Sequence, residues 1–583
     1  MRSCFVNRLA ASVAVLCAAV WTAPLAAAPP KLTGFFPAGG QIGQKVAVTA
    51  SGEFAKWPAE FHADRPGLTI VPAADKGKLD VQIAADALPG VYWLRAVDAE
   101  GASSPKAFLV DRVTELAEVE PNDAVEKGQT VELPTIVNGK VGKAGDVDGY
   151  LVSLKAGQSL TAALAAHAPL GSPMDAVLQI AELVGGGEPP SGTARYKFPR
   201  RAEAYVLEHC DDETGLDPQL TFVAPRDGRY LVRVFAFPSE PNSTIGYAGG
   251  DNYIYRLTLT AGPRVDIPLP LSRSTAAPAG PVYYLDGRAG SVPRPADLSP
   301  LNAAEESFAA DDRSWSWVQH AEAVNAAAIP WTSLPSLIAG PESLTAAGQE
   351  LAGPAVVSGL LPQPNAKALF RIPATKGQKW RLRVDSRSLG FPLDPHVSVV
   401  DAQGKQLAEN DDSGKDRDAL LTYAASADGP LRVVVRDVHH HGGPRYAYRL
   451  TAELLTPEPA VAVAADAFVL TAGKPLEIPV TIERRDGFAE ALEVSLEGLP
   501  AGVTAAPATS AATGDTAKAV KLVLNADPAA TTAVLQAPLR IAFASKGDAA
   551  KNIPPFKRYV TFAVPGAPQL HSQYWLTVVP AAK

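Results

Sequence analysis

Short segments in which apolar and polar residues alternate recur along much of the chain. Residues 79–83, Leu-Asp-Val-Gln-Ile, and residues 476–482, Leu-Glu-Ile-Pro-Val-Thr-Ile, place an apolar residue at every second position. A period of two is typical of a strand with one buried face. Residues 91–97, Val-Tyr-Trp-Leu-Arg-Ala-Val, are apolar almost throughout and predict a buried strand. Turn signals such as Ala-Gly-Gly at 38–40 separate these segments, so the sequence predicts an all-β fold.

The length of 583 residues predicts several domains, roughly four on the usual size range. A hydrophobic content of 47% is that of a globular protein, and 52 Pro with 47 Gly favour many short strands joined by turns. We expect tandem β-sandwiches. The expected boundaries are a signal peptide at 1–28, an immunoglobulin-like sandwich at 30–113, a first sandwich copy at 114–262, a linker or degenerate module at 263–341, a second copy at 342–455 and an immunoglobulin-like sandwich at 456–583.

The two sandwich copies are inferred from sequence blocks that recur in the same order. Leu-Gly-Ser-Pro-Met-Asp at 170–175 returns as Leu-Gly-Phe-Pro-Leu-Asp at 389–394. Tyr-Ile-Tyr-Arg-Leu-Thr at 253–258 returns as Tyr-Ala-Tyr-Arg-Leu-Thr at 446–451. We interpret this order as a domain duplication, in which the first copy carries an inserted surface loop near 185–201.

Two acidic clusters begin the first copy and carry its candidate chemistry. Hard oxygen ligands grouped in this way suit calcium, which takes six to eight oxygens from a flexible cage. The alternative is a solvated acidic linker with no bound ion. The proposed ligands are Glu118, Glu120, Asn122, Asp123, Asp146 and Asp148.

These blocks resemble the bacterial pre-peptidase C-terminal domain, a small jelly-roll-like β-sandwich. The matching pieces are Glu-Pro-Asn-Asp at 120–123, Gly-Asp-Val-Asp-Gly-Tyr at 145–150 and the closing Tyr-x-Tyr-Arg-Leu of both copies. The resemblance implies a domain that usually follows a secreted peptidase. In some collagenases it binds collagen and holds calcium before its first strand, which implies the same six ligands. The second copy departs from this pattern at 342–345 and 363–367, so no equivalent calcium site is expected there.

The first sandwich, at 30–113, resembles the immunoglobulin-like TIG modules of exported bacterial proteins. The residues that carry this resemblance are Phe-Pro-Ala-Gly-Gly at 36–40 and the rhythm of the strands.

The N-terminus predicts export. Arg2 and Arg8 precede an apolar run at 9–20, and Ala26-Ala27-Ala28 offers small residues for cleavage, with a membrane anchor as the alternative. Removing this segment leaves 51 basic against 61 acidic residues, a net charge of −10, and Cys210 as the single cysteine. An acidic exported chain is a poor candidate for nucleic acid binding, and no later segment predicts a membrane span.

Other candidates have simpler structural explanations. His439-His440-His441 lies in a loop, where neighbouring side chains point to different faces. Cys210 is expected to be an unreactive turn residue, and residues 302–325 a short helix anchored by Trp315 and Trp317. A second acidic group fits turns between strands, with a cation site as the alternative: Asp211, Asp212, Asp217, Asp411, Asp412, Asp416 and Asp418.

A search for phosphate loops, dinucleotide fingerprints, nucleophile elbows and His-Glu-x-x-His motifs finds none. We therefore predict an exported, non-enzymatic binding, adhesion or scaffold protein with a structural calcium ion. The expected partner is an extracellular polymer, protein or polysaccharide, or a secreted or cell-surface protein. One alternative is an accessory module acting in trans with a secreted peptidase or other hydrolase, and another is a cryptic hydrolase.

Overall fold

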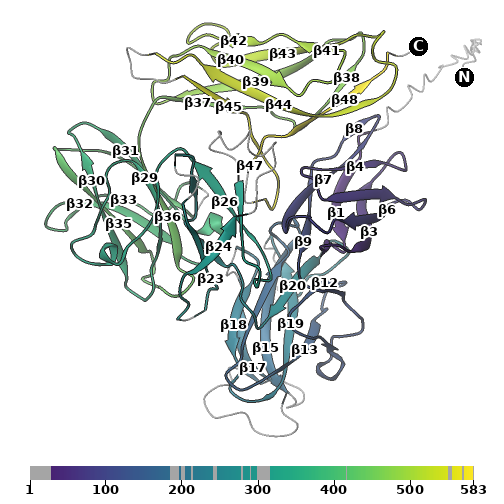
Figure 1. Ribbon diagram of the computed structural model, residues 1–583, viewed down its shortest axis with the longest axis vertical. Coiled ribbons are helices and arrows are strands. Elements are labelled where there is room, and N and C mark those ends of the chain that lie inside the picture. Colours follow the sequence, from purple (N-terminus) through teal and green to yellow (C-terminus); the bar gives the residue numbers. More distant parts are fainter. Residues whose placement is uncertain are drawn as a thin grey trace, which may run out of the picture.

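The computed structural model describes residues 28–183, 196–197, 204–211, 215–240, 246–276, 280–288, 290–298, 315–414, 417–548, 555–567 and 570–581. Across these ranges the chain forms strands and three short 3-10 turns, with no α-helix. The predicted all-β class with tandem sandwiches is confirmed (Figure 1). The expected signal peptide and the inserted loop near 185–201 lie almost wholly outside the described residues.

The first module is a sandwich of an antiparallel sheet, β1-β3-β6-β5, and a mixed sheet, β2-β9-β7-β4, in which β2 pairs with β9 in parallel. Its strands are β1 Lys31–Phe36, β2 Gly39–Gln41, β3 Lys45–Glu53, β4 Glu60–Ala63, β5 Leu68–Pro72, β6 Lys78–Ile83, β7 Gly90–Asp98, β8 Gly101–Ala102 and β9 Lys106–Asp111. In β7, six consecutive residues are buried, as the apolar run predicts. Tyr92, Leu94 and Ala96 enter the core of the module, whereas Trp93 faces other modules.

The first copy packs a five-stranded sheet, β10-β12-β20-β14-β18, on a six-stranded sheet, β11-β13-β19-β15-β17-β16. Twenty-four buried residues, including Tyr150 and Tyr255, fill the space between the sheets. The elements are β10 Glu115–Ala117, η1 Val125–Lys127, β11 Gln129–Thr130, β12 Thr135–Lys140, β13 Asp148–Leu154, β14 Ser159–Ala165, β15 Met174–Leu183, β16 Tyr196–Lys197, β17 Ala204–Cys210, β18 Gln219–Val223, β19 Gly228–Pro238 and β20 Ile254–Thr260.

The second copy repeats the order of the first five strands of each sheet, as β27-β29-β36-β31-β34 and β28-β30-β35-β32-β33. Its first strand begins before residue 342 and pairs with β29. The elements are β27 Ser336–Ile338, η2 Pro341–Leu344, β28 Gln349–Glu350, β29 Ala355–Leu360, β30 Lys367–Ala374, β31 Lys379–Asp385, η3 Arg387–Leu389, β32 Pro395–Val400, β33 Gln406–Asn410, β34 Ala419–Ala424, β35 Gly429–Asp437 and β36 Ala447–Leu454.

Between the copies lies a single six-stranded sheet, β21-β23-β24-β25-β26-β22, where the sequence predicts few strands. The helix expected over 302–325 is wrong at its C-terminal half, because residues 315–319 form a strand in which burial alternates with a period of two. Residues 320–325 form no helix, and residues 302–314 lie outside the described part of the chain. The strands are β21 Ile267–Leu269, β22 Arg273–Ser274, β23 Val282–Leu285, β24 Arg294–Leu298, β25 Trp315–Gln319 and β26 Ala327–Thr332.

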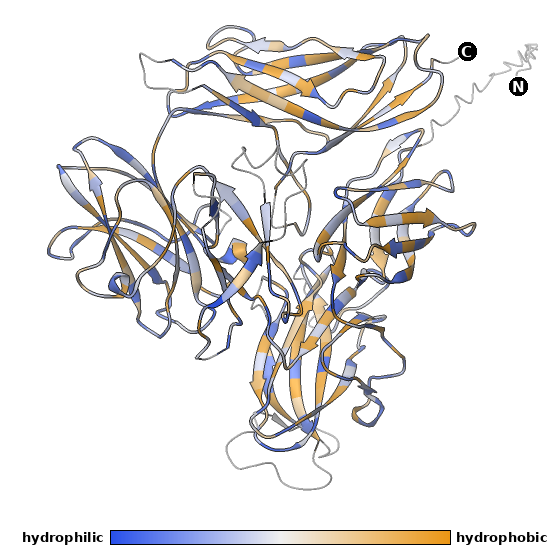
Figure 2. Ribbon diagram, viewed as in Figure 1, coloured by the Kyte–Doolittle hydropathy of each residue, from blue (hydrophilic) through white to orange (hydrophobic). Residues whose placement is uncertain are grey.

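The last module is a sandwich with sheet orders β37-β39-β43-β41 and β38-β48-β44-β40-β42, plus a β46–β47 hairpin. Apolar residues recur at intervals along its strands (Figure 2), and in β39 the predicted alternation buries Ile478, Val480 and Ile482. Its strands are β37 Glu458–Ala462, β38 Ala467–Thr471, β39 Leu476–Arg485, β40 Leu492–Glu497, β41 Val503–Ala505, β42 Ala508–Ser510, β43 Ala519–Ala526, β44 Leu535–Ser545, β45 Phe556–Tyr559, β46 Phe562–Ala563, β47 Leu570–His571 and β48 Tyr574–Val579.

Candidate metal centre

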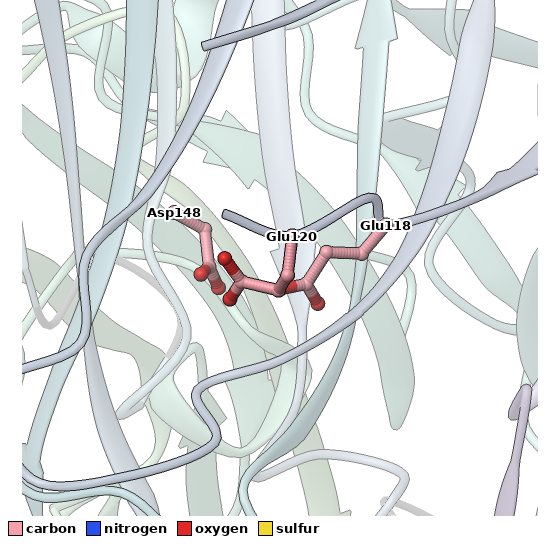
Figure 3. Close-up of side chains that lie close together, drawn as sticks. All are labelled: Glu118, Glu120 and Asp148. Carbon is pink, nitrogen blue, oxygen red and sulfur yellow. The ribbon is translucent and has the colours of Figure 1, made fainter. Parts of the chain in front are cut away.

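The two acidic segments of the first copy come together at one end of its sandwich. The first segment leaves β10, the edge strand that pairs in parallel with β12. The second segment ends in β13, which belongs to the opposite sheet. Glu118, Glu120 and Asp148 form one group whose carboxylate oxygens lie within 4.8 Å of one another (Figure 3), and Glu120, Asp123 and Asp146 form another. Glu120 belongs to both groups, so the five carboxylates make one continuous cluster.

Strand alternation explains why two of these carboxylates point inward. Asp146 and Asp148 are buried on the cluster side, whereas Val147 between them packs on Phe235 and Val177. Asp146 Oδ2 accepts a hydrogen bond from the Gly142 amide at 2.6 Å, which fixes the loop before the strand. The start of β13 and the loop just before it therefore supply two inward carboxylates, Asp148 and Asp146.

Backbone amides position the carboxylates of the other segment. Glu118 Oε2 accepts a hydrogen bond from the Lys140 amide at 2.5 Å, and Glu120 Oε2 accepts one from the Asn122 amide at 2.9 Å. Each of these bonds uses one oxygen of its carboxylate and leaves the second oxygen available. The cluster therefore keeps oxygen atoms that can bind a cation.

The negative charge of the cluster is uncompensated within the described part of the chain. No ion pair there joins any of the five carboxylates to Lys, Arg or His. Burial, together with the neighbouring carboxylates, raises the pKa of Asp148 to about 9 and that of Glu118 to about 7, and it also raises the pKa of Asp146. Buried carboxylates without a counter-charge favour either protonation or a bound cation.

Asn122 strengthens the case for a ligand. Its side chain is fully buried, and neither its amide oxygen nor its amide nitrogen has a hydrogen-bond partner. Oδ1 of the buried Asp148 also lacks a partner. Buried polar atoms are nearly always bonded, so the unpaired oxygens of Asn122 and Asp148 fit a site for a cation. The donor set of carboxylate and amide oxygens fits calcium.

Two tyrosines lie behind the cluster, and the sequence analysis did not assign them a role. The Tyr255 hydroxyl donates a hydrogen bond to Asp148 Oδ2 at 2.6 Å, and the Tyr150 hydroxyl lies 2.5 Å from the Tyr255 hydroxyl. Burial raises the pKa of both hydroxyls well above the usual value, so they remain neutral donors. Alternation signals only Tyr150, which follows Asp148 by two residues, whereas Tyr255 lies on the distant strand β20.

The second copy places other residues at the same positions. Leu178 and Val397 correspond through the repeated blocks, and their strand partners are Val234 and Val435. By this register Asp148 corresponds to Ala368, and Asp146 to Ala366. The amides of Glu118 and Ala339 donate to equivalent carbonyls, so these two residues also correspond. The positions of three proposed ligands therefore hold alanine in the second copy.

Two residues of the other acidic group, Asp217 and Asp418, have a structural role. The Asp217 carboxylate accepts hydrogen bonds from the His167 and Ala168 amides, both at 2.8 Å, and Asp418 binds the Ser386–Ser388 amides in the second copy. Each carboxylate thus fixes a loop of its sandwich. Asp211, Asp411 and Asp412 are exposed, and the structure brings none of them into a described three-ligand group. Asp212 and Asp416 lie outside the described residues.

The remaining candidates are dispersed. The side chains of His439 and His441 are exposed, with ring centroids 5.9 Å apart, and they belong to no described three-ligand group. Cys210 ends strand β17 and is not in a turn, and its Sγ donates to the Gln219 carbonyl at 3.3 Å. Trp317 is half-buried, and the Arg65 guanidinium lies 4.7 Å from the centre of its ring.

Comparison with known proteins gives likenesses of fold at low identity. No protein-family model and no curated protein sequence matches the chain. The pre-peptidase C-terminal domain of a Bacillus anthracis collagenase is 12% identical, with 18% of this chain and 94% of that domain covered and a TM-score of 0.15. Aeromonas hydrophila PliG, a periplasmic lysozyme inhibitor, is 16% identical over 25% of this chain and 96% of that protein, with a TM-score of 0.15.

A third likeness extends over most of the chain. Escherichia coli alpha-2-macroglobulin activated by porcine elastase is 11% identical, with 93% of this chain and 52% of that protein covered and a TM-score of 0.16. The chain thus spans about half the length of that larger protein. Within the described residues, no helix is both long and apolar enough to cross a membrane. The fold and the site define a tandem β-sandwich protein with one acidic cluster able to hold a metal ion.

Proposed function

We propose that this protein is an exported, non-enzymatic binding or scaffold protein whose first sandwich copy holds structural calcium. The observation that carries the proposal is the cluster of five carboxylates, whose first segment also contains the fully buried Asn122 side chain with no hydrogen-bond partner at either polar atom. The N-terminal sequence supports export, and the tandem modules provide extended surfaces for a polymer or a protein partner.

Calcium suits this cluster better than magnesium or a transition metal. The ligands are oxygens from two separate chain segments, and an irregular cage of this kind fits the variable geometry of calcium. Magnesium demands a near-ideal octahedron, and transition metals favour imidazole or thiolate ligands, which the cluster lacks. The two groups that share Glu120 provide room for one ion or for a bridged pair.

The expected role of the ion is to fix the junction between the first module and the first copy. The ligand segment directly follows β10, where buried Arg256 pairs with both Asp111 and Glu115 across the same junction. Without the cation, the repelling carboxylates would loosen this segment. With the cation, β10 and β13 are held together, so the angle between the modules becomes fixed.

The proposal is tested by differential scanning calorimetry of the mature protein in calcium and in chelator, with titration calorimetry for affinity and stoichiometry. The test variant is Asp146→Ala with Asp148→Ala, which the second copy already carries in the form of Ala366 and Ala368. The control is Asp411→Asn with Asp412→Asn, an exposed acidic pair with the same change in charge.

Calcium should raise the melting temperature of the wild type and of the control, but not that of the test variant. Coincident curves for the wild type in calcium and chelator, with no heat of binding, would show that the cluster is only an acidic linker. The two alternative functions differ in readout, since an accessory module would alter the activity of a partner hydrolase and a cryptic hydrolase would turn over substrate alone.

A further inference from the structure

The outer face of the β30–β35 strand pair in the second copy carries four cations in two cross-strand pairs. Lys367 lies directly opposite Arg436, and Arg371 lies directly opposite Arg432. Leu369 and Val434 form the pair between them. Like charges directly opposite each other destabilise a sheet, so two such pairs on neighbouring strands impose a cost on the fold. We call Lys367, Arg371, Arg432 and Arg436 the basic strip.

Most of these charges have no carboxylate partner among the described residues. Arg371 lies 3.1 Å from Glu350, whereas Lys367 and Arg432 form no ion pair there. Arg436 donates to two backbone carbonyls, those of Asp437 and Val438. Glu409 on the neighbouring strand β33 bonds to His396 at 2.7 Å and lies within electrostatic reach of Arg436.

The arginines in the opposite sheet of the same sandwich differ from those of the basic strip. These three arginines all have carboxylate partners: Arg381 contacts Glu453, Glu458 and Asp486, whereas Arg383 and Arg449 share Asp385. The chain as a whole is acidic, with a net charge of −8. Its composition therefore does not explain a strip in which only Arg371 forms an ion pair among the described residues.

The first copy provides an internal comparison. By strand register, Lys367, Arg371, Arg432 and Arg436 correspond to Val147, Leu151, Leu231 and Phe235. These four apolar residues are buried, and Leu151 with Leu231 packs against Val125 of η1 and against Leu183. In the second copy the same face holds Lys367 exposed and the three arginines half-buried (Figure 1 shows its strands on the side away from β23–β26). The same scaffold thus carries a covered apolar face in one copy and an accessible basic face in the other.

We propose that the basic strip binds an extended acidic polypeptide segment of a partner protein. Residues four apart on a strand are separated by about 13 Å, so the two cationic pairs are spaced by that distance. An extended peptide repeats the same rise. It therefore places acidic side chains at positions i and i+4 over the cations and an apolar side chain at i+2 over Leu369 and Val434.

Arginine recognises carboxylates through charge-assisted and often bidentate hydrogen bonds, and clusters of arginine are a recurrent device for acidic motifs. The apolar pair at the centre of the strip favours a peptide over a sulfated polysaccharide, which has no apolar group to place there. This inference deepens the proposed binding role and rests on it, but it does not require calcium.

The test uses fluorescence anisotropy with a labelled peptide of pattern Glu-Thr-Leu-Thr-Glu, flanked by threonines, and the full mature chain in chelator. The control peptide has the same composition with both glutamates adjacent. We expect the patterned peptide to bind, with an affinity that falls as salt rises. The double variant Arg432→Gln/Arg436→Gln should weaken binding about tenfold or more. Lys45→Gln/Lys521→Gln, which removes two exposed lysines in other modules, should have no effect.

Two further measurements separate binding from stability. The melting temperature of Arg432→Gln/Arg436→Gln should be unchanged or higher, because the substitution relieves repulsion within the sheet. Arg432→Glu/Arg436→Glu should instead bind a peptide with lysine in place of glutamate. Equal binding of both acidic peptides, an unaffected glutamine variant, or binding of a sulfated polysaccharide without the peptide would each overturn the proposal. A calcium response that persists in those cases would leave the calcium site standing.

Discussion

Arg95 Nη1 lies 2.8 Å from Asp466 Oδ2, so an ion pair joins β7 of the first module to the last module across 371 residues of sequence. The same guanidinium contacts the carbonyls of Ser103 and Gln573, and Gln536 Nε2 donates to the Asp98 carbonyl at 2.7 Å. Arg381 of the second copy also forms ion pairs with Glu458 and Asp486 of the last module. These contacts join the last module both to the first module and to the second copy, so the modules form a closed arrangement.

Breaking the Arg95–Asp466 pair should allow the first and last modules to separate. Arg95 is only 4% exposed, and removing one partner of a buried pair leaves the other charge uncompensated. We expect Arg95→Met to cost about 3 kcal/mol in the apparent free energy of the first urea unfolding transition. Small-angle scattering should show a larger radius of gyration.

A double-mutant cycle isolates the pair. Arg95→Met with Asp466→Asn should cost less than the sum of the single changes, with a coupling energy of about 1–2 kcal/mol. Lys31→Met serves as the control, because its pair with Glu53 is exposed and should contribute less than about 1 kcal/mol. Strict additivity of the Arg95 and Asp466 changes would show that the contact does not stabilise the closed form.

His571 makes the same interface sensitive to acid. Its ring lies 4.9 Å from that of Trp93, and burial, with Arg95 nearby, lowers its pKa to about 4 against the weaker opposing effect of Asp466. Between pH 6.5 and 4 the unfolded chain binds a proton that the native chain excludes. Stability is therefore nearly complete above pH 6.5 and falls as the pH drops toward 4, by about 3 kcal/mol from this residue.

The measurement is urea unfolding at several pH values between 7 and 4.5, comparing the wild type with His571→Gln. The difference between the two proteins isolates the histidine from other titrating groups. The variant should lose less stability than the wild type on acidification. Parallel pH profiles would contradict the prediction.

Tyr255 and Tyr448 occupy the same position in the two copies, each opposite a glycine of the neighbouring strand, but their hydroxyls differ. Tyr255 donates to Asp148, whereas the Tyr448 hydroxyl is buried without a partner. Tyr448→Phe should therefore be neutral or stabilising by up to about 1 kcal/mol, because it removes an unpaired polar group. Tyr255→Phe should destabilise by about 1–2 kcal/mol in chelator. Calorimetry of the two matched variants checks both signs, and equal effects would contradict the assignment.

At the metal centre, local sequence patterns predicted the carboxylates but not the tyrosines behind them. Alternation placed Asp146 and Asp148 on one face, and the clustering of oxygens brought Glu118 and Glu120 to them, because these residues lie in short segments next to strands. The tyrosine layer depends on the pairing of β20 with β12, and pairing between distant strands is not encoded in a local period. Five of the six predicted ligands come together, whereas their binding of an ion remains a prediction.

The arrangement of the modules was beyond sequence reasoning. The Arg95–Asp466 pair depends on how separately folded sandwiches dock, and neither residue has a local signal. Trp315 and Trp317 suggested a helix because the flanking residues are rich in alanine, yet tertiary pairing with β26 makes this segment a strand. The period of two in Trp-Ser-Trp-Val was present but short.

Asn122 provides the sharpest test of the metal centre, because its substitution should change stability differently with and without calcium. In chelator, Asn122→Ala removes two unpaired buried polar atoms, which offsets the lost packing, so stability should change by less than about 1 kcal/mol. In calcium at one hundred times the dissociation constant, the ion contributes about 2.7 kcal/mol to the wild type. The variant should lose most of that contribution.

Asn138→Ala is the matched control. Asn138 is also buried in the first copy, but its Nδ2 donates to Glu115 at 2.7 Å, and Glu115 is not one of the five carboxylates of the cluster. Its substitution should therefore destabilise the protein by a similar amount in calcium and in chelator, about 1–2 kcal/mol. If Asn122→Ala behaves like this control, the amide is only a structural residue. A loss confined to calcium instead identifies the Asn122 side chain as a ligand of the ion.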